Sequence, residues 1–332
     1  MFALAQASLA APVAMLRWIG GQGTRAIAAL VFIGIAVPPL GELLKAYVTH
    51  AIFLLLCISF MRVDPAALRD HLRRPGLVLA ATAWTTIAVP LAIGLLSRIT
   101  GFDKTWPDLH LALMLQAVAS PMMASPALAA LMGLDATLVL ITLVTSTALV
   151  PFTASLFAYA FFGAALSLSP LGLGLKLVVI LAGALAVAAA IRWIFGAAAI
   201  ARQKAAIDGV NIVILLVFVA AVMGNVAGSL FADPLRMIGL AALAFAIFFV
   251  LLGVTTLIFA GIGLDRALAL GLMVSQRNMG LMLAATDGVL PGTAWLYFAL
   301  SQFPIYLSPQ LLQPMVRRLV ARETMAAVVD PR

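Results

Sequence analysis

The chain has 332 residues, of which 64% are hydrophobic and only 10% are charged, whereas soluble domains average about 45 to 50% apolar and about 25% charged residues. The mean hydropathy of +1.17 excludes a soluble globular protein, and it also excludes one membrane anchor carrying a large soluble domain, because such a domain lowers the average. The formal net charge of +8 comes mainly from basic residues in short connections between apolar stretches, so it indicates orientation in a lipid bilayer and no binding to nucleic acid.

Residues 1–25 form a segment of their own at the N-terminus. They lack a basic region at their start, and Arg17 follows their apolar part, so we expect a short interfacial helix and no cleaved signal peptide. Cys57 is the single cysteine of the chain, which excludes an intramolecular disulfide and a cysteine metal cluster.

Ten apolar stretches divide the chain at charged residues or at glycine and proline. A membrane-spanning helix needs about 20 apolar residues, so ten spans are about the most that this length supplies. The stretches are continuous and do not alternate as membrane barrel strands do, and the predicted fold is therefore all-α. The expected spans are 26–44, 48–61, 76–97, 109–132, 136–162, 171–195, 207–230, 235–262, 266–286 and 291–314.

The positions of the basic residues predict how these spans are oriented. With the N-terminus in the cytoplasm, about fourteen of the twenty basic residues lie inside and about five lie outside. This bias predicts ten spans with both termini inside, in what we expect to be a bacterial inner membrane. Residues 26–162 and 163–314 then form two inverted five-helix repeats, an arrangement typical of secondary transporters, and residues 315–332 form a cytoplasmic tail.

A short internal match accompanies this division into two halves. Residues 125–135 read SPALAALMGLD and residues 277–287 read RNMGLMLAATD. Each has a small or polar start, an apolar run and an aspartate at the same distance, and the two lie about 152 residues apart in the fourth span of each half. A match of this length also arises by chance in a chain rich in alanine and leucine.

Two Ser-Pro pairs, Ser120-Pro121 and Ser125-Pro126, interrupt the fourth expected span. Proline lacks the backbone N–H and disfavours helix at the residue before it, so we predict a broken helix that restarts at Pro126 with Ser125 as its cap. Broken backbone in hydrocarbon is tolerated only where it is buried in protein or lines a cavity. The alternative is a proline kink packed against neighbouring helices.

The ninth expected span carries Ser275, Gln276, Arg277 and Asn278 near its middle. A charge at the bilayer centre costs roughly 2.5 to 3.5 kcal/mol on insertion scales, so Arg277 needs a partner or an aqueous cavity. Either backbone carbonyls of the broken helices satisfy it, or it contacts an anionic substrate or replaces a coupling cation. Half-helices that start near Pro126 and Asn278 would also direct their N-terminal dipoles at one place, which favours an anion.

The polar residues around this place are candidates for contact with an anionic substrate. Gln116 precedes the first Ser-Pro pair by one turn, and it either faces a cavity or bonds to a neighbouring helix. The full set of candidate substrate-binding residues is Arg277, Asn278, Gln276, Ser275, Ser125, Ser120 and Gln116.

The order and spacing of these motifs resemble the bile acid:sodium symporter family over nearly the whole chain. Residues 63–75, VDPAALRDHLRRP, look like the family's loop L-x-P-x-x-F-x-x-x-L-x-x-P, and residues 120–125, SPMMAS, stand where the family has C-P-G-G-x-x-S-N. Ser146-Thr147 with Pro151 is similar to S-T-L-x-x-P, and residues 278–281, NMGL, to the end of E-x-G-x-Q-N-x-x-L. The resemblance implies a core domain in which broken helices 4 and 9 cross, a panel domain, and alternating access by their relative movement.

The resemblance also implies a sodium site, from which this chain departs. The family holds sodium with carboxylate, amide and hydroxyl oxygens around the crossing, and hard cations prefer such oxygen ligands. The family's ninth-span glutamate falls on Met273 or on Gly271, and its glutamine falls on Arg277. Pro126 replaces the asparagine that follows Ser125. The hydroxyl ligands that remain for an ion are Ser125, Thr85, Thr142 and Thr145.

These departures predict a carrier that is not coupled to sodium at the usual sites of the family. Arg277 would supply a fixed positive charge where the family places the cation, and the added charge repels sodium. If a proton is coupled instead, Asp135 and Asp287 are the nearest carboxylates, although both lie at span ends, where an aspartate is commonly solvated.

The preferred function is therefore secondary transport of a small organic anion, with no cofactor and no metal site. An exporter similar to auxin or arsenite carriers is one alternative, and the absence of a cysteine from the fourth span weakens the arsenite version. A non-transporting membrane scaffold or receptor is another. We do not expect an enzyme, because the sequence has no HExxH, no GxSxG and no carboxylate pair in the spans.

Overall fold

Helices and the connections between them make up the part of the chain that this computed structural model describes, which is residues 2–63, 75–162 and 169–329. No strand occurs within those ranges, in agreement with the predicted all-α class. Most of the loop motif at residues 63–75 lies outside the described residues.

Six helices are long and apolar enough to cross a membrane, which confirms the membrane class. They correspond to the second, third, fifth, sixth, seventh and eighth expected spans. Their bounds are Pro38–Arg62, Pro75–Ile99, Ala136–Phe162, Pro170–Phe195, Lys204–Ala232 and Pro234–Ile258.

The other four expected spans have a different local structure. The first is divided at Val37, whose φ of −125° and ψ of 69° are not helical, because Pro38 disfavours helix at the residue before it. The tenth lies within α19 (Gly292–Val329), which continues as one helix past residue 314. The fourth and ninth are each two shorter helices joined by a non-helical linker.

The chain folds into two units, and each unit is built from two separate stretches of sequence. Unit 1 comprises Met1–Val63 and Val179–Pro234, and unit 2 comprises Asp64–Val178 and Leu235–Arg332. Each unit therefore takes helices from both of the expected repeats. The division falls within α12 (Pro170–Phe195).

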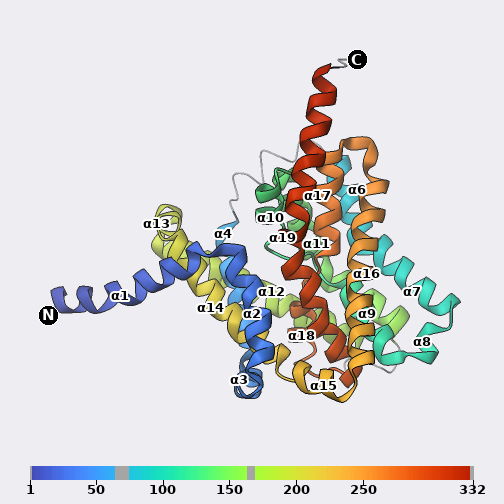
Figure 1. Cartoon of the computed structure of the whole chain (residues 1–332), viewed down its shortest axis with the longest axis horizontal. Coiled ribbons are helices and arrows are strands. Elements are labelled where there is room, and N and C mark those ends of the chain that lie inside the picture. The colour runs from blue at the N-terminus through green and yellow to red at the C-terminus, as the bar shows by residue number, and fades with distance from the viewer. Residues whose placement is uncertain (1, 64–74, 163–168, 330–332) are drawn as a thin grey trace. The chain divides into compact units, whose positions relative to one another are not determined.

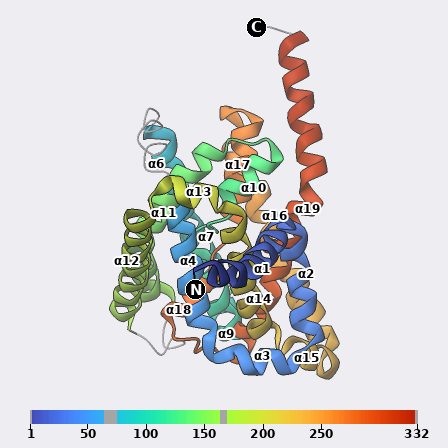
Figure 2. The same ribbon diagram turned by 90° about the vertical axis from the view of Figure 1, so that its left-hand side faces the viewer.

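Unit 1 is organised around α14 (Lys204–Met223), which packs against four other helices of the unit, α1, α2, α3 and α4 (Figure 2). A Cβ at Gly41 would lie 2.5 Å from the Cα of Gly224, so only glycine allows this approach of α3 to the end of α14. The remaining helices of unit 1 are α1 (Phe2–Gly21), α2 (Gly23–Ala36), α3 (Pro38–Leu44), η1 (Lys45–Tyr47), α4 (Val48–Arg62), α13 (Ala197–Arg202) and α15 (Val226–Ala232).

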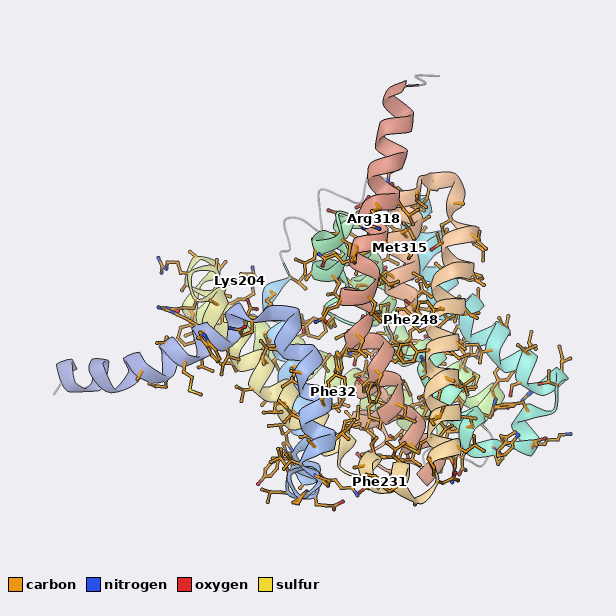
Figure 3. All side chains as sticks on the ribbon, viewed as in Figure 1. Phe32, Lys204, Phe231, Phe248, Met315 and Arg318 are labelled. Carbon is orange, nitrogen blue, oxygen red and sulfur yellow. The ribbon has the colours of Figure 1, made fainter. Side chains whose placement is uncertain are left out.

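Unit 2 contains both interrupted helices. Its apolar core gathers residues of α6, α10, α11, α16, α17 and α19, among them Phe248 (Figure 3). The C-terminal turns of α19 extend beyond the other helices of this unit (Figure 1). The other elements of unit 2 are α6 (Pro75–Ala83), η2 (Trp84–Ala88), α7 (Val89–Ile99), α8 (Phe102–Thr105), α9 (Pro107–Val118), α10 (Ser125–Met132), α11 (Ala136–Phe157), η3 (Ala158–Phe162), α16 (Pro234–Ile258), η5 (Ala260–Ile262), α17 (Leu264–Ser275) and α18 (Met279–Ala285).

Candidate functional site

The first interruption separates α9 from α10, as the two Ser-Pro pairs predict. Helix α9 ends at Val118, and Ala119 turns to extended backbone with φ −62° and ψ 148°. Helix α10 restarts at Ser125 with Pro126 in its first turn. The prediction that Ser125 caps α10 is wrong: the cap residue is Ala124, and the Ser125 hydroxyl instead donates to Oε1 of Gln276 at 3.4 Å.

The second interruption separates α17 from α18 at the predicted polar residues. Helix α17 ends at Ser275 and α18 begins at Met279. Asn278 is the cap of α18, and its side-chain oxygen accepts from the backbone N–H of Leu281 at 3.3 Å. This bond satisfies one of the free donors that every helix N-terminus carries, so Asn278 fixes the point at which the helix restarts.

The two linkers pair with each other in antiparallel fashion, with Pro121 opposite Arg277. The backbone N–H of Met122 donates to the Gln276 carbonyl, and that of Asn278 donates to the Ser120 carbonyl, both at 2.7 Å. Pro121 stands at the position of this pair that makes no backbone hydrogen bond, so its missing N–H costs nothing. We call residues 119–124 and 276–278 the crossing.

Arg277 lies inside the crossing, where its side chain is only 1% exposed. One terminal nitrogen of the guanidinium donates to the Ala119 carbonyl at 3.1 Å and to the Thr85 carbonyl at 3.2 Å, and the other donates to Thr85 at 3.2 Å. Ala119 follows the last turn of α9, where the helix dipole is negative and carbonyls lack helical partners. The guanidinium therefore occupies a site that attracts a cation.

The Thr85 carbonyl is free to accept from Arg277 because of the sequence around it. Thr85 belongs to the π-helical segment η2, and the N–H of Val89 bonds to the carbonyl of Trp84, five residues earlier. In a π-helix the N–H of residue 90 would donate to the Thr85 carbonyl, but residue 90 is Pro90, which has no N–H. A π-helical turn followed by proline thus exposes one buried carbonyl, and Arg277 binds it.

No carboxylate balances the charge of Arg277 among the described residues. None of their ion pairs involves Arg277, and its Nε is buried without a hydrogen-bond partner. Met273 is fully buried, and a Cβ at Gly271 would lie 2.7 Å from the Leu252 carbonyl on α16. The resemblance places a glutamate at position 273 or 271. This chain has Met273 and Gly271 there, so neither position supplies a carboxylate to the crossing.

Most of the other predicted substrate-binding residues bond within the protein. Gln276 accepts from Ser125, and its Nε2 donates to Ser308 Oγ at 3.4 Å. Ser275 donates to the Leu272 carbonyl at 2.9 Å. Gln116 accepts from the Tyr297 hydroxyl at 2.6 Å, which corresponds to the second of its two predicted alternatives, a bond to a neighbouring helix.

Polar residues of α19 belong to this site and were not found from the sequence. Tyr297, Ser301 and Ser308 are all buried and bond to Gln116, to the sulfur of Met279 and to Gln276 respectively. Their spacing of four and seven residues places them along one face of the helix. That regular spacing of polar residues in the tenth expected span was the signal available in the sequence.

The hydroxyls predicted as ion ligands differ in how they are bonded. Thr85 donates to the carbonyl of Ala81 at 2.6 Å, and Thr145 shares a hydrogen bond with Thr82 at 2.8 Å. The hydroxyl of Thr142 is buried without a partner, as is that of Ser120, one of the predicted substrate-binding residues. Thr85 thus meets the crossing through its carbonyl and not through its hydroxyl.

Both candidate proton carriers lie away from the crossing and pair with basic residues. Asp135 caps α11 by accepting from the N–H of Leu138 at 2.9 Å, and it pairs with Arg266 at 3.3 Å. Asp287 pairs with Lys176, and its side chain is 64% exposed. Both ion pairs connect elements of unit 2.

No group of three His, Cys, Asp or Glu side chains that would hold a metal ion occurs among the described residues. Comparison of the whole sequence with known families and proteins gives no match to a family model and none to a curated protein.

Proposed function

We propose that this protein is a secondary transporter that moves a small organic anion across the membrane by alternating access. Its proposed architecture is similar to that of the bile acid:sodium symporter family: ten spans in two inverted repeats, with both termini in the cytoplasm, in a bacterial inner membrane. The observation that carries the proposal is the buried guanidinium of Arg277 at the meeting point of two interrupted helices.

The two interrupted helices favour a transporter over a scaffold. Non-helical backbone at membrane depth is stable only in contact with protein or with an aqueous cavity. In inverted-repeat transporters such segments form the substrate site near the middle of the membrane. Here one interrupted helix comes from each expected half of the chain, and their linkers bond to each other.

The division into two units supports the inverted repeat. Unit 1 holds the expected spans 1, 2 and 7 with most of span 6, and unit 2 holds spans 3 to 5 and 8 to 10. Corresponding spans of the two halves thus fall in the same unit, as they would if a pseudo-twofold axis related the halves. In the terms of the resemblance, unit 1 is the panel and unit 2 is the core.

The unbalanced charge of Arg277 favours an anionic substrate. Burying a cation without a counter-ion is costly, and an anion beside the crossing recovers part of that cost. Asn278 and residues 122–124 are partly exposed, while Arg277 itself is buried. The substrate therefore approaches on the side of Asn278, and the unpartnered Nε of Arg277 is a donor that remains for its carboxylate or sulfonate.

Arg277 also takes the place of a coupling cation. Carbonyl oxygens at the ends of half-helices and in unwound segments are the ligands that hold sodium in such transporters, and here two carbonyls of this kind accept from the guanidinium. A second cation next to this charge would be repelled. We therefore propose transport without sodium coupling, and Asp135 and Asp287 are the candidates if a proton is coupled.

Counterflow in proteoliposomes tests this function. Vesicles loaded with an unlabelled carboxylate are diluted into a trace of the same labelled carboxylate, over a panel of mono- and dicarboxylates. We expect exchange of at least one anion at equal rates in sodium and in potassium, loss of exchange in Arg277→Ala, and retention in Arg98→Ala, which removes an exposed arginine of the same unit. A scaffold exchanges none of the anions, and a steep sodium requirement that survives Arg277→Ala contradicts the proposal.

A further inference from the structure

One end of unit 1 carries a dense group of basic side chains that the crossing does not use. The group surrounds the C-terminal ends of α1, α4 and α12 and the start of α14, where Figure 3 labels Lys204. Its five cationic members are Arg17, Arg62, Arg192, Arg202 and Lys204, and we call them the basic end. Among the described residues at this end, Asp208 is the carboxylate that pairs with them, and it pairs with Arg62 and Lys204.

Hydrogen bonds connect the basic end across four helices and the turn before α14. Arg62 and Lys204 both pair with Asp208, at 2.7 Å and 2.9 Å. Arg192 donates to the backbone carbonyls of Met61 and Val63 at the end of α4, each at 2.9 Å. Arg17 of α1 donates to the side chain of Gln203 at 2.9 Å. These contacts hold four of the five side chains at this end of unit 1, and Arg202 directly precedes Gln203, the residue that Arg17 contacts.

The group keeps most of its positive charge because its acceptors are mainly neutral. Arg192 bonds to backbone carbonyls and Arg17 to a side-chain amide, so neither pairs with a carboxylate of the described residues. The opposite end of α14 differs in sign, since Glu42, Lys45 and Asp233 are the charged residues of unit 1 there. Orientation in a membrane needs an excess of basic residues on one side, but it does not require them to be connected in this way.

Two exposed tryptophans stand next to the basic end. Trp18 follows Arg17 and is 67% exposed, and Trp193 follows Arg192 and is 87% exposed. Tryptophan side chains prefer the depth of the lipid headgroups. Exposed indoles beside Arg17 and Arg192 therefore place these cations at the depth of the lipid phosphates.

We propose that the basic end is a binding surface for anionic phospholipid headgroups. Arg17, Arg202 and Lys204 are exposed and provide the lipid contacts. Arg62, which is also exposed, pairs with Asp208 of α14, and Arg192 joins α12 to the end of α4. A phosphodiester accepts several hydrogen bonds from guanidinium and ammonium groups at once. The surface belongs to unit 1 alone and does not depend on the transport proposed for the crossing.

Lipid binding to the full-length protein in neutral detergent tests this surface. Native mass spectrometry and thermal unfolding are compared with phosphatidylglycerol, phosphatidylcholine or inorganic phosphate added. We expect phosphatidylglycerol to bind and to raise the unfolding temperature, with little effect of phosphatidylcholine or of phosphate. The double variant Arg202→Gln/Lys204→Gln should weaken phosphatidylglycerol binding by roughly fivefold for each charge removed.

The control is Lys45→Gln, which removes a basic residue at the opposite end of unit 1 and should leave phosphatidylglycerol binding unchanged. Both substituted residues of the double variant are exposed, and the exposed pair of Lys204 adds little to stability, so the variant should fold. Equal binding of the two lipids, an equal response to free phosphate, or an equal loss in Lys45→Gln would each overturn the proposal.

Discussion

Replacing Arg277 by alanine should destabilise the protein, because the guanidinium satisfies two buried carbonyls at once. The carbonyls of Thr85 and Ala119 lose donors at 3.1 to 3.2 Å, and each buried unsatisfied carbonyl costs about 1 to 3 kcal/mol. Releasing a buried charge offsets part of this loss. We therefore expect unfolding to become easier by about 2 to 4 kcal/mol.

A small planar cation should restore what the alanine variant loses. Guanidinium ion at millimolar concentration has the shape and the donors to enter the vacated site, and a ligand that binds only the folded state stabilises it by RT ln(1 + [L]/Kd). The assay is thermal unfolding in detergent with guanidinium chloride or sodium chloride at equal ionic strength. We expect guanidinium, but not sodium, to raise the unfolding temperature of Arg277→Ala. Guanidinium should not raise the unfolding temperature of the wild-type protein or of Arg98→Ala. An alanine variant as stable as the wild type would refute the reasoning, as would one that sodium rescues equally well.

Three further substitutions test single contacts of unit 2, each by thermal unfolding. Tyr297→Phe removes the 2.6 Å hydrogen bond to buried Gln116 and should lower the free energy of unfolding by about 1 to 3 kcal/mol. Tyr159→Phe, at an 82% exposed position, should change it little, and equal effects of the two variants would contradict this expectation. Gly271→Ala places a Cβ 2.7 Å from the Leu252 carbonyl and should cost about 1 to 3 kcal/mol, whereas Gly253→Ala meets nothing within 4 Å and should be neutral or stabilising. Asp135→Asn keeps a capping oxygen for α11 but loses the part-exposed pair with Arg266, so the loss should stay below about 1 kcal/mol; in transport assays, a changed pH profile would instead assign a proton to Asp135.

Local backbone chemistry explains why the interruptions were predictable. The Ser-Pro pairs and the capping residue Asn278 act within one turn of the chain, so the sequence near them predicts where α9 ends and α18 begins. Val37 is a break of the same kind, since Pro38 and Pro39 follow it, and the expected span 26–44 overlooked that signal. Helix ends controlled by proline and capping residues are thus readable from sequence.

Contacts between distant segments explain what the sequence did not predict. Arg277 and Thr85 are 192 residues apart, and the free carbonyl of Thr85 exists only because η2 adopts a π-helical turn before Pro90. Ser125 was a reasonable cap by local rules, but Gln276, 151 residues away, offers its hydroxyl an acceptor. Side-chain roles at the crossing depend on which helices meet there, and periodicity alone does not carry that information.

A cation that is part of the chain changes the energetics of transport. A bound sodium ion drives accumulation because it enters from one side and leaves on the other, whereas in the proposed carrier the charge of Arg277 stays with the protein in both of its conformations. A ligand shifts a conformational equilibrium only by its differential affinity, so a permanent charge couples no ion gradient to the substrate. Movement of a monovalent anion then transfers one net negative charge, and the membrane potential alone sets its distribution.

We therefore expect transport to be electrogenic and independent of sodium. One charge crossing 100 mV is worth about 2.3 kcal/mol, which corresponds to an accumulation of about 50-fold at equilibrium. In proteoliposomes, a valinomycin-induced potential of 100 mV, positive inside, should accumulate a transported monocarboxylate by about this factor, and a sodium gradient without a potential should accumulate none. Accumulation that follows a pH gradient and is insensitive to the potential would show that one proton moves with each anion. Such a result would remove the role proposed for Arg277 as the replacement of a coupling ion, and Asp135 and Asp287 would become the residues to examine.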